Sequence, residues 1–188
     1  MADIIPVIMI RENLADIPQY PLPQGFSVRN FKRGEGDIWA QINADAGGFA
    51  TFEDAQSRFA IEFADPVNDM ESRCFFIFDD SNGQAIGTAM AWYDSDFCGQ
   101  LWGRVHWVAI LPQYQGRGLA KPLLTSVLNR MAEYHDKVVL GTQTFRRVAI
   151  NLYLDLGFKP FLSSPTCRQA WNELAAETRH PALINYIK

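Results

Sequence analysis

The residues with the clearest chemical signal form a short glycine-rich segment, Gln115-Gly116-Arg117-Gly118-Leu119-Ala120. This segment follows an apolar, strand-like run that ends at Pro112, and it opens an amphipathic helical stripe. Glycines let a backbone approach an anion closely, and the free amides and the dipole at a helix N-terminus stabilise negative charge. The segment therefore predicts a binding site for a pyrophosphate.

The spacing of these residues sets aside two common nucleotide-binding loops. The sequence has no Gly-x-x-x-x-Gly-Lys-Ser/Thr, and no Gly-x-Gly-x-x-Gly with an acidic residue about 20 positions later. Instead, Ile110-Leu111-Pro112 followed by the 115–120 segment resembles the acetyl-CoA-binding motif of the GNAT superfamily of N-acetyltransferases. Residues 149–158 resemble that family's Ala-x-x-Leu-Tyr-x-x-x-Gly-Phe block. Together with the elements before them, the resemblance covers approximately residues 26–162.

The resemblance implies a role for each matched residue. The exposed backbone of Val108 and Ile110 would bind the pantetheine of acetyl-CoA, and a backbone amide near Val108 would stabilise the oxyanion. Tyr153 matches the tyrosine that family members place near the sulfur, where it acts as general acid. The amides expected to bind the pyrophosphate are those of Gln115, Gly116, Arg117, Gly118, Leu119 and Ala120. Acetyl-CoA is the implied co-substrate, and no metal is implied.

A second proton-transfer group is needed because only a neutral amine attacks a thioester. His106 lies two residues before Val108, so strand alternation predicts both side chains on one face of the sheet. Some GNAT enzymes carry a catalytic histidine on this strand, whereas others use a carboxylate or a chain of waters. Both assignments have a structural alternative: His106 as a half-buried histidine among aromatics, and Tyr153 as a core aromatic. Arg146 stands where many relatives have asparagine, and we leave it outside the predicted site.

The segments around these residues alternate between strand and helix patterns. We expect strands at 26–31, 74–78, 85–93, 100–111, 137–143 and 158–162. Helices are expected at 38–46, 51–63, 116–131, 146–156 and 167–178, with a polar loop at 94–99. An antiparallel half followed by a βαβαβ half predicts an α/β, GNAT-like fold, in which helices flank a mixed twisted sheet of six or seven strands.

The domain organisation is predicted from proline content and length. Residues 1–25 contain Pro6, Pro18, Pro21 and Pro23, which favour an extended arm lying on the domain over a helix. With 188 residues, 48% of them apolar, the chain can bury one sizeable core. We therefore expect a Pro-rich arm at 1–25 and a single acetyltransferase domain at 26–188.

Composition limits the classes of binding partner and the cellular compartment that we expect. The net charge is −4 and no basic run indicates binding to nucleic acid or anionic lipid. No stretch approaches the roughly 20 apolar residues of a membrane span. Cys74, Cys98 and Cys167 lack disulfide or zinc spacing, which favours a metal-free protein in the reducing cytoplasm. The oligomeric state is open, with a homodimer the commonest prior.

These features predict an N-acetyltransferase that moves an acetyl group from acetyl-CoA to a primary amine. Direct attack in a ternary complex is favoured because the matched motifs contain no cysteine to carry an acyl group. The alternative is a non-catalytic acyl-CoA-binding or sensing module, which fold analogy does not exclude. A longer acyl donor stays open, as does the acceptor, which is a small molecule or a peptide amine.

Overall fold

The architecture is one mixed sheet with helices on both faces. A computed structural model describes residues 5–63 and 67–187, and within them seven strands are ordered β2-β3-β4-β5-β6-β1-β7. The strands are β1 (Pro6–Arg11), β2 (Phe26–Asn30), β3 (Cys74–Asp79), β4 (Gln84–Phe97), β5 (Gln100–Ile110), β6 (Val138–Gln143) and β7 (Lys159–Pro160). The predicted mixed sheet of six or seven strands is confirmed.

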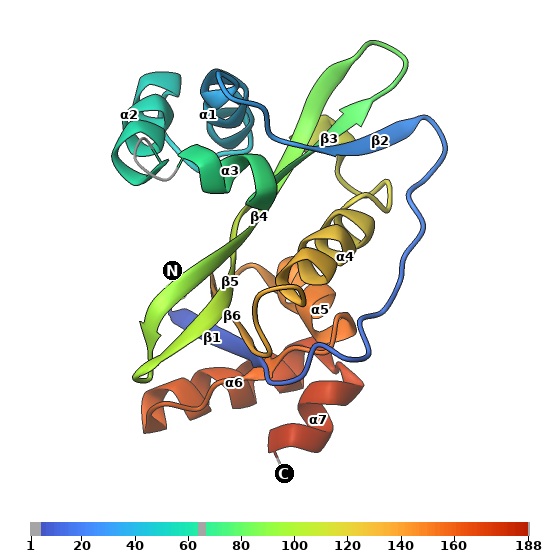
Figure 1. Ribbon diagram of the computed structural model, residues 1–188. Helices are drawn as coiled ribbons and strands as arrows, with labels where there is room; N and C mark the ends of the chain where they lie inside the picture. The colour runs from blue at the N-terminus through green and yellow to red at the C-terminus, as the bar shows by residue number, and fades with distance from the viewer. Residues whose placement is uncertain (1–4, 64–66, 188) are drawn as a thin grey trace.

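Helices α1 (Gly36–Asp45), α2 (Phe52–Phe63) and α3 (Val67–Arg73) lie on one side of the sheet (Figure 1). Helices α4 (Ala120–Met131) and α5 (Arg147–Asp155) lie on the other side, while α6 (Pro165–Thr178) and α7 (Pro181–Ile187) lie together at one end of the molecule, with α7 against β7. Because the central strand β4 is covered on both faces, every residue from Ile86 to Trp92 is buried. Helices α3 and α7, of seven residues each, were not predicted from the sequence.

Local sequence signals explain where several elements begin. The Asp54 amide donates to Thr51 Oγ1 at 3.1 Å, so the Thr51 side chain caps the start of α2. Pro122 lies in the first turn of α4, where its missing amide removes no intrahelical hydrogen bond. Gly83 has a φ of +70° in the turn between β3 and β4, and those strands pair antiparallel as expected.

Strand β1 corrects the expectation of an extended arm over residues 1–25. It lies inside the sheet, antiparallel to β6 from Pro6–Gln143 to Arg11–Val138, and antiparallel to β7 on its other edge. Pro6 is the first residue of the strand, a position that tolerates a missing amide. Because β1 separates β6 from β7, the last strand pair of the predicted βαβαβ half does not form.

The predicted polar loop at 94–99 is also wrong in its extent. Strand β4 continues to Phe97, and the turn to β5 is made by Cys98 and Gly99 with φ values of +53° and +77°. Two consecutive residues with positive φ suit the twist of a two-residue hairpin. The polar residues 94–96 are therefore the end of a strand that extends beyond the covered part of the sheet, where at least one side is open to water.

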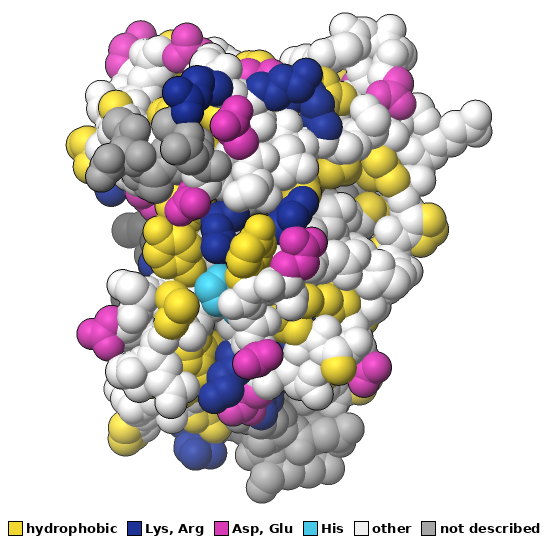
Figure 2. All heavy atoms as spheres, in the orientation of Figure 1, with side chains coloured by type: hydrophobic (Ala, Val, Ile, Leu, Met, Phe, Trp, Pro, Cys, Tyr) yellow, Lys and Arg dark blue, Asp and Glu magenta, His cyan; other side chains and the backbone are white. Residues whose placement is uncertain are grey.

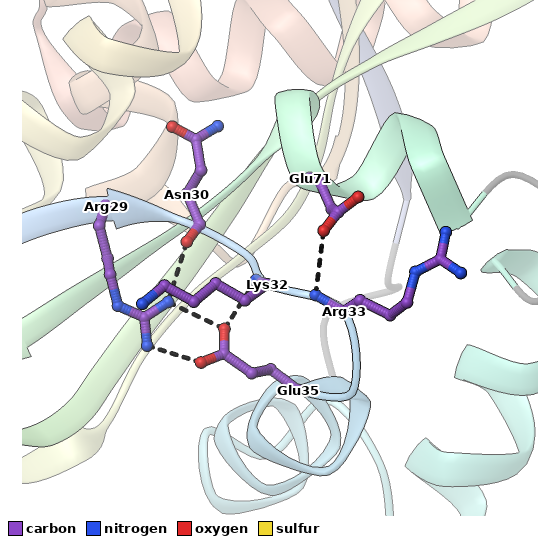
Figure 3. Close-up of polar contacts among 6 residues, drawn as sticks. All are labelled: Arg29, Asn30, Lys32, Arg33, Glu35 and Glu71. Atoms are coloured by element: carbon purple, nitrogen blue, oxygen red, sulfur yellow. Dashed lines mark hydrogen bonds and ion pairs between the residues drawn. The ribbon is translucent and has the colours of Figure 1, made fainter.

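A charged network joins β2 to the start of α1 (Figure 3). The Arg29 guanidinium donates to both carboxylate oxygens of Glu35, at 2.8 and 2.7 Å, and the Lys32 amide donates to one of them at 2.8 Å. The hydrogen bond from Arg29 is the main reason that the pKa of Glu35 is below its ordinary value. This network fixes the helix pair α1–α2 relative to the sheet edge.

Two further features are the distribution of charge on the surface and the length and polarity of the helices. Side chains of Lys and Arg are interspersed with those of Asp and Glu over the face drawn in Figure 2. Across the described residues, no helix combines the length and apolar character that crossing a membrane requires.

Candidate active site

A cleft opens where two neighbouring parallel strands separate. Within the described residues, β5 and β6 pair at Gly103–Val138 and Arg104–Val139, and their later residues are not paired with each other. The cleft has a volume of about 560 Å³, within the range typical of small-molecule sites. Its walls come from β5, β6, β1, the α1–α2 region and α5, and they include His106, Val108, Ile110, Gln115 and Tyr153.

The predicted phosphate loop, residues 115–120, lies at the head of α4. Gly116 and Gly118 have φ values of +75° and +77°, and a Cβ atom added at either would contact no other part of the protein. Backbone conformation rather than crowding therefore explains both glycines. The N-cap residue Leu119 offers no side-chain cap, so the amides at this helix head stay uncovered by the described residues.

Gln115 differs from the other residues of the loop. Its amide donates to the Pro112 carbonyl at 3.2 Å, so the prediction that residues 115–120 all offer free amides needs correction to residues 116–120. The Gln115 side chain donates to the Ile110 carbonyl at 2.9 Å and so covers one backbone group on the open edge of β5. The Arg117 guanidinium lies 4.8 Å from the centre of the Tyr114 ring. The residues present fit an anion held by main-chain amides, with no need of a basic side chain.

A bulge in β5 interrupts the alternation on which the His106 prediction relied. Met90 pairs with His106 and Thr88 pairs with Ala109, so β5 holds one residue more than β4 between these pairs. Trp107 has a φ of +46°, which is rare for a bulky residue. His106 contacts α2 and Trp107 stacks on Phe49 at 5.1 Å, so consecutive side chains face the same helix pair. The bulge therefore removes the regular alternation from which we predicted that His106 and Val108 share a face, although both residues line the cleft.

Glu62, which the sequence analysis did not single out, contacts two residues that line the cleft, His106 and Trp107. Its Oε1 atom lies 2.5 Å from His106 Nε2, and its Oε2 atom accepts from Trp107 Nε1 at 3.3 Å. Partial burial of Glu62 raises its pKa, but the hydrogen bond and charge of His106, with Trp107 and Arg58, outweigh burial and lower it overall. One signal was available: Glu62 falls at the spacing of the α2 apolar stripe, three residues after Phe59, where a carboxylate needs a partner.

Tyr153 lies on α5 and lines the cleft on the side opposite the α1–α2 pair. Its side chain is largely buried, and its ring is 6.0 Å from that of Phe158 in an edge-on arrangement. Burial raises the pKa of Tyr153 to about 12, with the nearby Arg146 guanidinium opposing. The hydroxyl therefore stays protonated throughout the neutral range. Arg146, which we left outside the predicted site, also lines the cleft.

The polar side chains that line the cleft include His106 and Tyr153, the Glu62 carboxylate lies behind His106, and the loop with the free amides adjoins the cleft at Gln115. Among the residues that the structure describes, no group of three or more His, Cys, Asp or Glu side chains is arranged to hold a metal ion. The arrangement suits anion binding at one end and proton transfer at the other.

Comparison with known proteins relates the chain to acetyltransferases. Mycothiol acetyltransferase from Pseudarthrobacter chlorophenolicus is 28% identical over 155 residues, covering 77% of this chain and 46% of that protein. The enzyme of the same name from Corynebacterium aurimucosum is 31% identical over 147 residues, covering 70% and 46%. The chain thus spans slightly under half the length of these two curated relatives.

Solved structures share the fold at lower identity. A GCN5-related N-acetyltransferase from Sphaerobacter thermophilus superimposes with a TM-score of 0.66 at 21% identity, covering 83% of this chain and 48% of that one. A chain of the NatC complex bound to Gag peptide and CoA gives a TM-score of 0.54 at 19% identity, with 70% and 83% covered. The family model described as "Acetyltransferase (GNAT) family" matches residues 39–158, which include the loop, His106 and Tyr153. This chain belongs to the GNAT family of acetyltransferases.

Proposed function

We propose that this protein transfers an acetyl group from acetyl-CoA to a primary amine by direct attack in a ternary complex. The observation that carries the proposal is the cleft between β5 and β6, which has groups suited to anion binding at one end and groups suited to proton transfer along its walls. Gln115 at its one end leads into the uncovered amides of residues 116–120, and His106 and Tyr153 line its walls. A donor anchored at the first end would reach the second along the open edge of β5.

Main-chain groups would hold the donor. The amides of Gly116, Arg117, Gly118, Leu119 and Ala120 point from a helix head, whose dipole adds about 0.3–1 kcal/mol for each nearby negative charge. The open edge of β5 at Val108 and Ile110 would bind the pantetheine as a strand binds its neighbour. For this pairing, the Gln115 side chain would release the Ile110 carbonyl that it now covers.

Three groups would handle protons and charge. His106 accepts the proton that the acceptor ammonium loses, directly or through water, and later returns it to solvent. A backbone amide near Val108, next to the bulge, donates a hydrogen bond to the carbonyl oxygen as it gains negative charge. Tyr153 donates its proton to the sulfur while the carbon–sulfur bond breaks, and it regains a proton from solvent. The products are the N-acetyl amide and free CoA thiol.

The test is release of free CoA thiol from acetyl-CoA with a panel of amines. The panel contains polyamines, aminoglycosides, peptide N-termini and mycothiol-related amines, the last because the curated relatives are named mycothiol acetyltransferases. Propionyl-CoA and succinyl-CoA, run in parallel, establish the preferred acyl chain. His135→Gln serves as a matched control for His106→Gln, because His135 contacts Arg73 rather than the cleft residues.

Two outcomes would contradict the proposal. If calorimetry detects no binding of CoA or acetyl-CoA, the pyrophosphate assignment of residues 116–120 fails. If CoA binds but no amine in the panel is acetylated, the result supports the alternative, an acyl-CoA-sensing module, over an acetyltransferase.

The proposal extends to the setting of the protein. Free thiols at Cys74, Cys98 and Cys167 support function in a reducing cytoplasm. Light scattering after size-exclusion chromatography tests the expected homodimer.

A further inference from the structure

We propose that Glu62 is a positioning residue that fixes the orientation and the tautomer of His106, leaving His106 Nδ1 as the free base at the cleft. The role of this pair in catalysis rests on the proposed function. The hydrogen bond itself is independent of any acceptor. It joins helix α2 to strand β5, two elements whose contacting residues lie 44 positions apart in the chain.

Both oxygens of the Glu62 carboxylate have a partner. One oxygen lies 2.5 Å from His106 Nε2, and the other accepts from Trp107 Nε1 at 3.3 Å. Two donors from consecutive residues hold the carboxylate in one plane, so it cannot turn toward a third partner without losing one of them. The arrangement is therefore that of a fixed acceptor behind the histidine.

A distortion of the β5 backbone at Trp107 produces this arrangement. Consecutive residues of a regular strand face opposite sides, and the bulge at Trp107 brings both side chains to the α1–α2 side. A positive φ at a non-glycine residue persists only where surrounding contacts enforce it. Here Trp107 is held against Trp39 at 5.2 Å and Phe49 at 5.1 Å, between ring centres.

The two ring nitrogens of His106 differ in their surroundings, because only Nε2 faces Glu62. An ionised carboxylate accepts but does not donate, so the nitrogen that faces Glu62 must carry a hydrogen. Nδ1 is then the atom that is left to exchange a proton when the ring is neutral, and His106 lines the cleft. A histidine with both nitrogens free would divide its population between two tautomers and several ring orientations.

The charged groups around the pair come from three elements, α2, β4 and β5. Arg58, on α2, lies close enough to favour the ionised form of Glu62. Arg104, on β5, pairs with Asp94 of β4 at 3.7 Å and also lines the cleft. Across the sheet Met90 lies opposite His106, and on α1 the Asn43 amide donates to the Trp39 carbonyl. Glu62 is thus the carboxylate in direct contact with His106.

The structural test is nitrogen NMR of the imidazole rings in the full-length protein, which has three histidines. His106→Gln identifies the His106 signals. We expect over about nine-tenths of the neutral ring to carry the hydrogen on Nε2 in the wild type, and a measurable Nδ1–H population in Glu62→Ala. Glu53→Ala, an exposed position on the same helix, should leave the signals unchanged. A wild-type ring protonated on Nδ1, or tautomers that do not respond to Glu62→Ala, would overturn the proposal.

The kinetic test separates positioning from direct participation. Glu62→Gln keeps the shape of the side chain and removes its charge, so kcat should fall roughly 10- to 100-fold with the KM for acetyl-CoA unchanged. In a His106→Gln background the same substitution should add less than about twofold, because Glu62 acts through the ring. Fully additive losses would overturn the proposal by making Glu62 an independent base. If the wild type acetylates no amine, the proposed function fails, and the NMR result alone decides whether Glu62 fixes the ring.

Discussion

Under the proposed function, the two ends of the cleft recognise their ligands by different means. At the α4 end, recognition depends on main-chain amides, and the side chains contribute little: Arg117 lies over Tyr114 and Leu119 is buried. At the α2 end, it depends on side chains from separate elements, with Glu62 and Trp107 contacting each other and Glu62 contacting His106. Main-chain recognition requires a backbone conformation, whereas side-chain chemistry requires tertiary contacts.

This difference predicts different sensitivities to mutation. Where amides bind the ligand, a change of backbone conformation should be severe and a change of side chain mild. Where side chains carry the protons, replacement of a single functional group should reduce kcat while donor affinity is preserved. Each measurement below tests one half of this contrast.

The largest effect is expected from Gly118→Val, which adds a β-branched side chain at a φ of +77°. We expect the affinity for CoA, measured by calorimetry, to fall at least about 100-fold because the amides of the helix head move. Gly99→Val is the matched control, since Gly99 has the same φ of +77° and the same open surroundings in the distant β4–β5 turn. Arg117→Ala should change the affinity by less than about threefold. A large loss with Arg117→Ala would show that a side chain binds the phosphate.

Tyr153→Phe should have the next largest effect and act on turnover. Removal of the hydroxyl that donates to the leaving sulfur should lower kcat by roughly 100- to 1,000-fold, within the range of general acid catalysis. The affinity for CoA should stay within about twofold, because the ring still packs against Phe158. Tyr134→Phe, at an exposed tyrosine, is the control. Equal turnover of wild type and Tyr153→Phe would assign Tyr153 to the core alone.

The same contrast explains which parts of the site the sequence predicts. The loop at 115–120, the helix behind it and Tyr153 are specified by residues within short segments, because glycine spacing and helix periodicity are local properties. Helix α4 indeed begins where Pro122 falls in its first turn. The positive φ values at Gly116 and Gly118 and the start of α4 agree with the glycine spacing, with one correction at Gln115, while the binding role of this loop stays a prediction.

The remaining features depend on pairing between distant segments. Strand β1 pairs with β6 from Pro6–Gln143 onward, and nothing near residue 6 specifies a partner 137 positions later. The bulge at Trp107 depends on the register against β4 and on the aromatic rings that hold the indole. Glu62 also could not be identified from its local sequence, since its proposed role depends on a contact with His106, which is distant in the chain. Propensity and periodicity carry no information on these pairings.

A smaller effect is expected in the pH dependence of stability, which tests the burial of Tyr153. Because burial raises its pKa from 10.0 to about 12, the unfolded chain loses the phenolic proton at lower pH than the folded chain does. The contribution of Tyr153 to the free energy of unfolding is therefore fully present below pH 10. Between about pH 10 and 12 the free energy of unfolding falls by roughly 2–3 kcal/mol. Denaturant unfolding of wild type and Tyr153→Phe at pH 9, 10.5 and 12 measures the difference. Parallel pH curves for the two proteins would contradict a buried phenol.

The smallest effect is expected from the Arg29–Glu35 pair, which joins β2 to the start of α1 and so helps to hold the helix pair α1–α2 on the sheet. Its two groups are partly exposed, so Glu35→Gln should lower the free energy of unfolding by only about 0.5–1.5 kcal/mol at pH 7. Because the hydrogen bond from Arg29 lowers the pKa of Glu35, the wild-type advantage should be present above about pH 4.5 and disappear as the pH falls below it. The affinity for CoA should not change, since the proposed donor site is at the head of α4. A parallel loss of CoA affinity would mean that the two ends of the cleft are coupled, and the contrast between them would then hold for chemistry but not for stability.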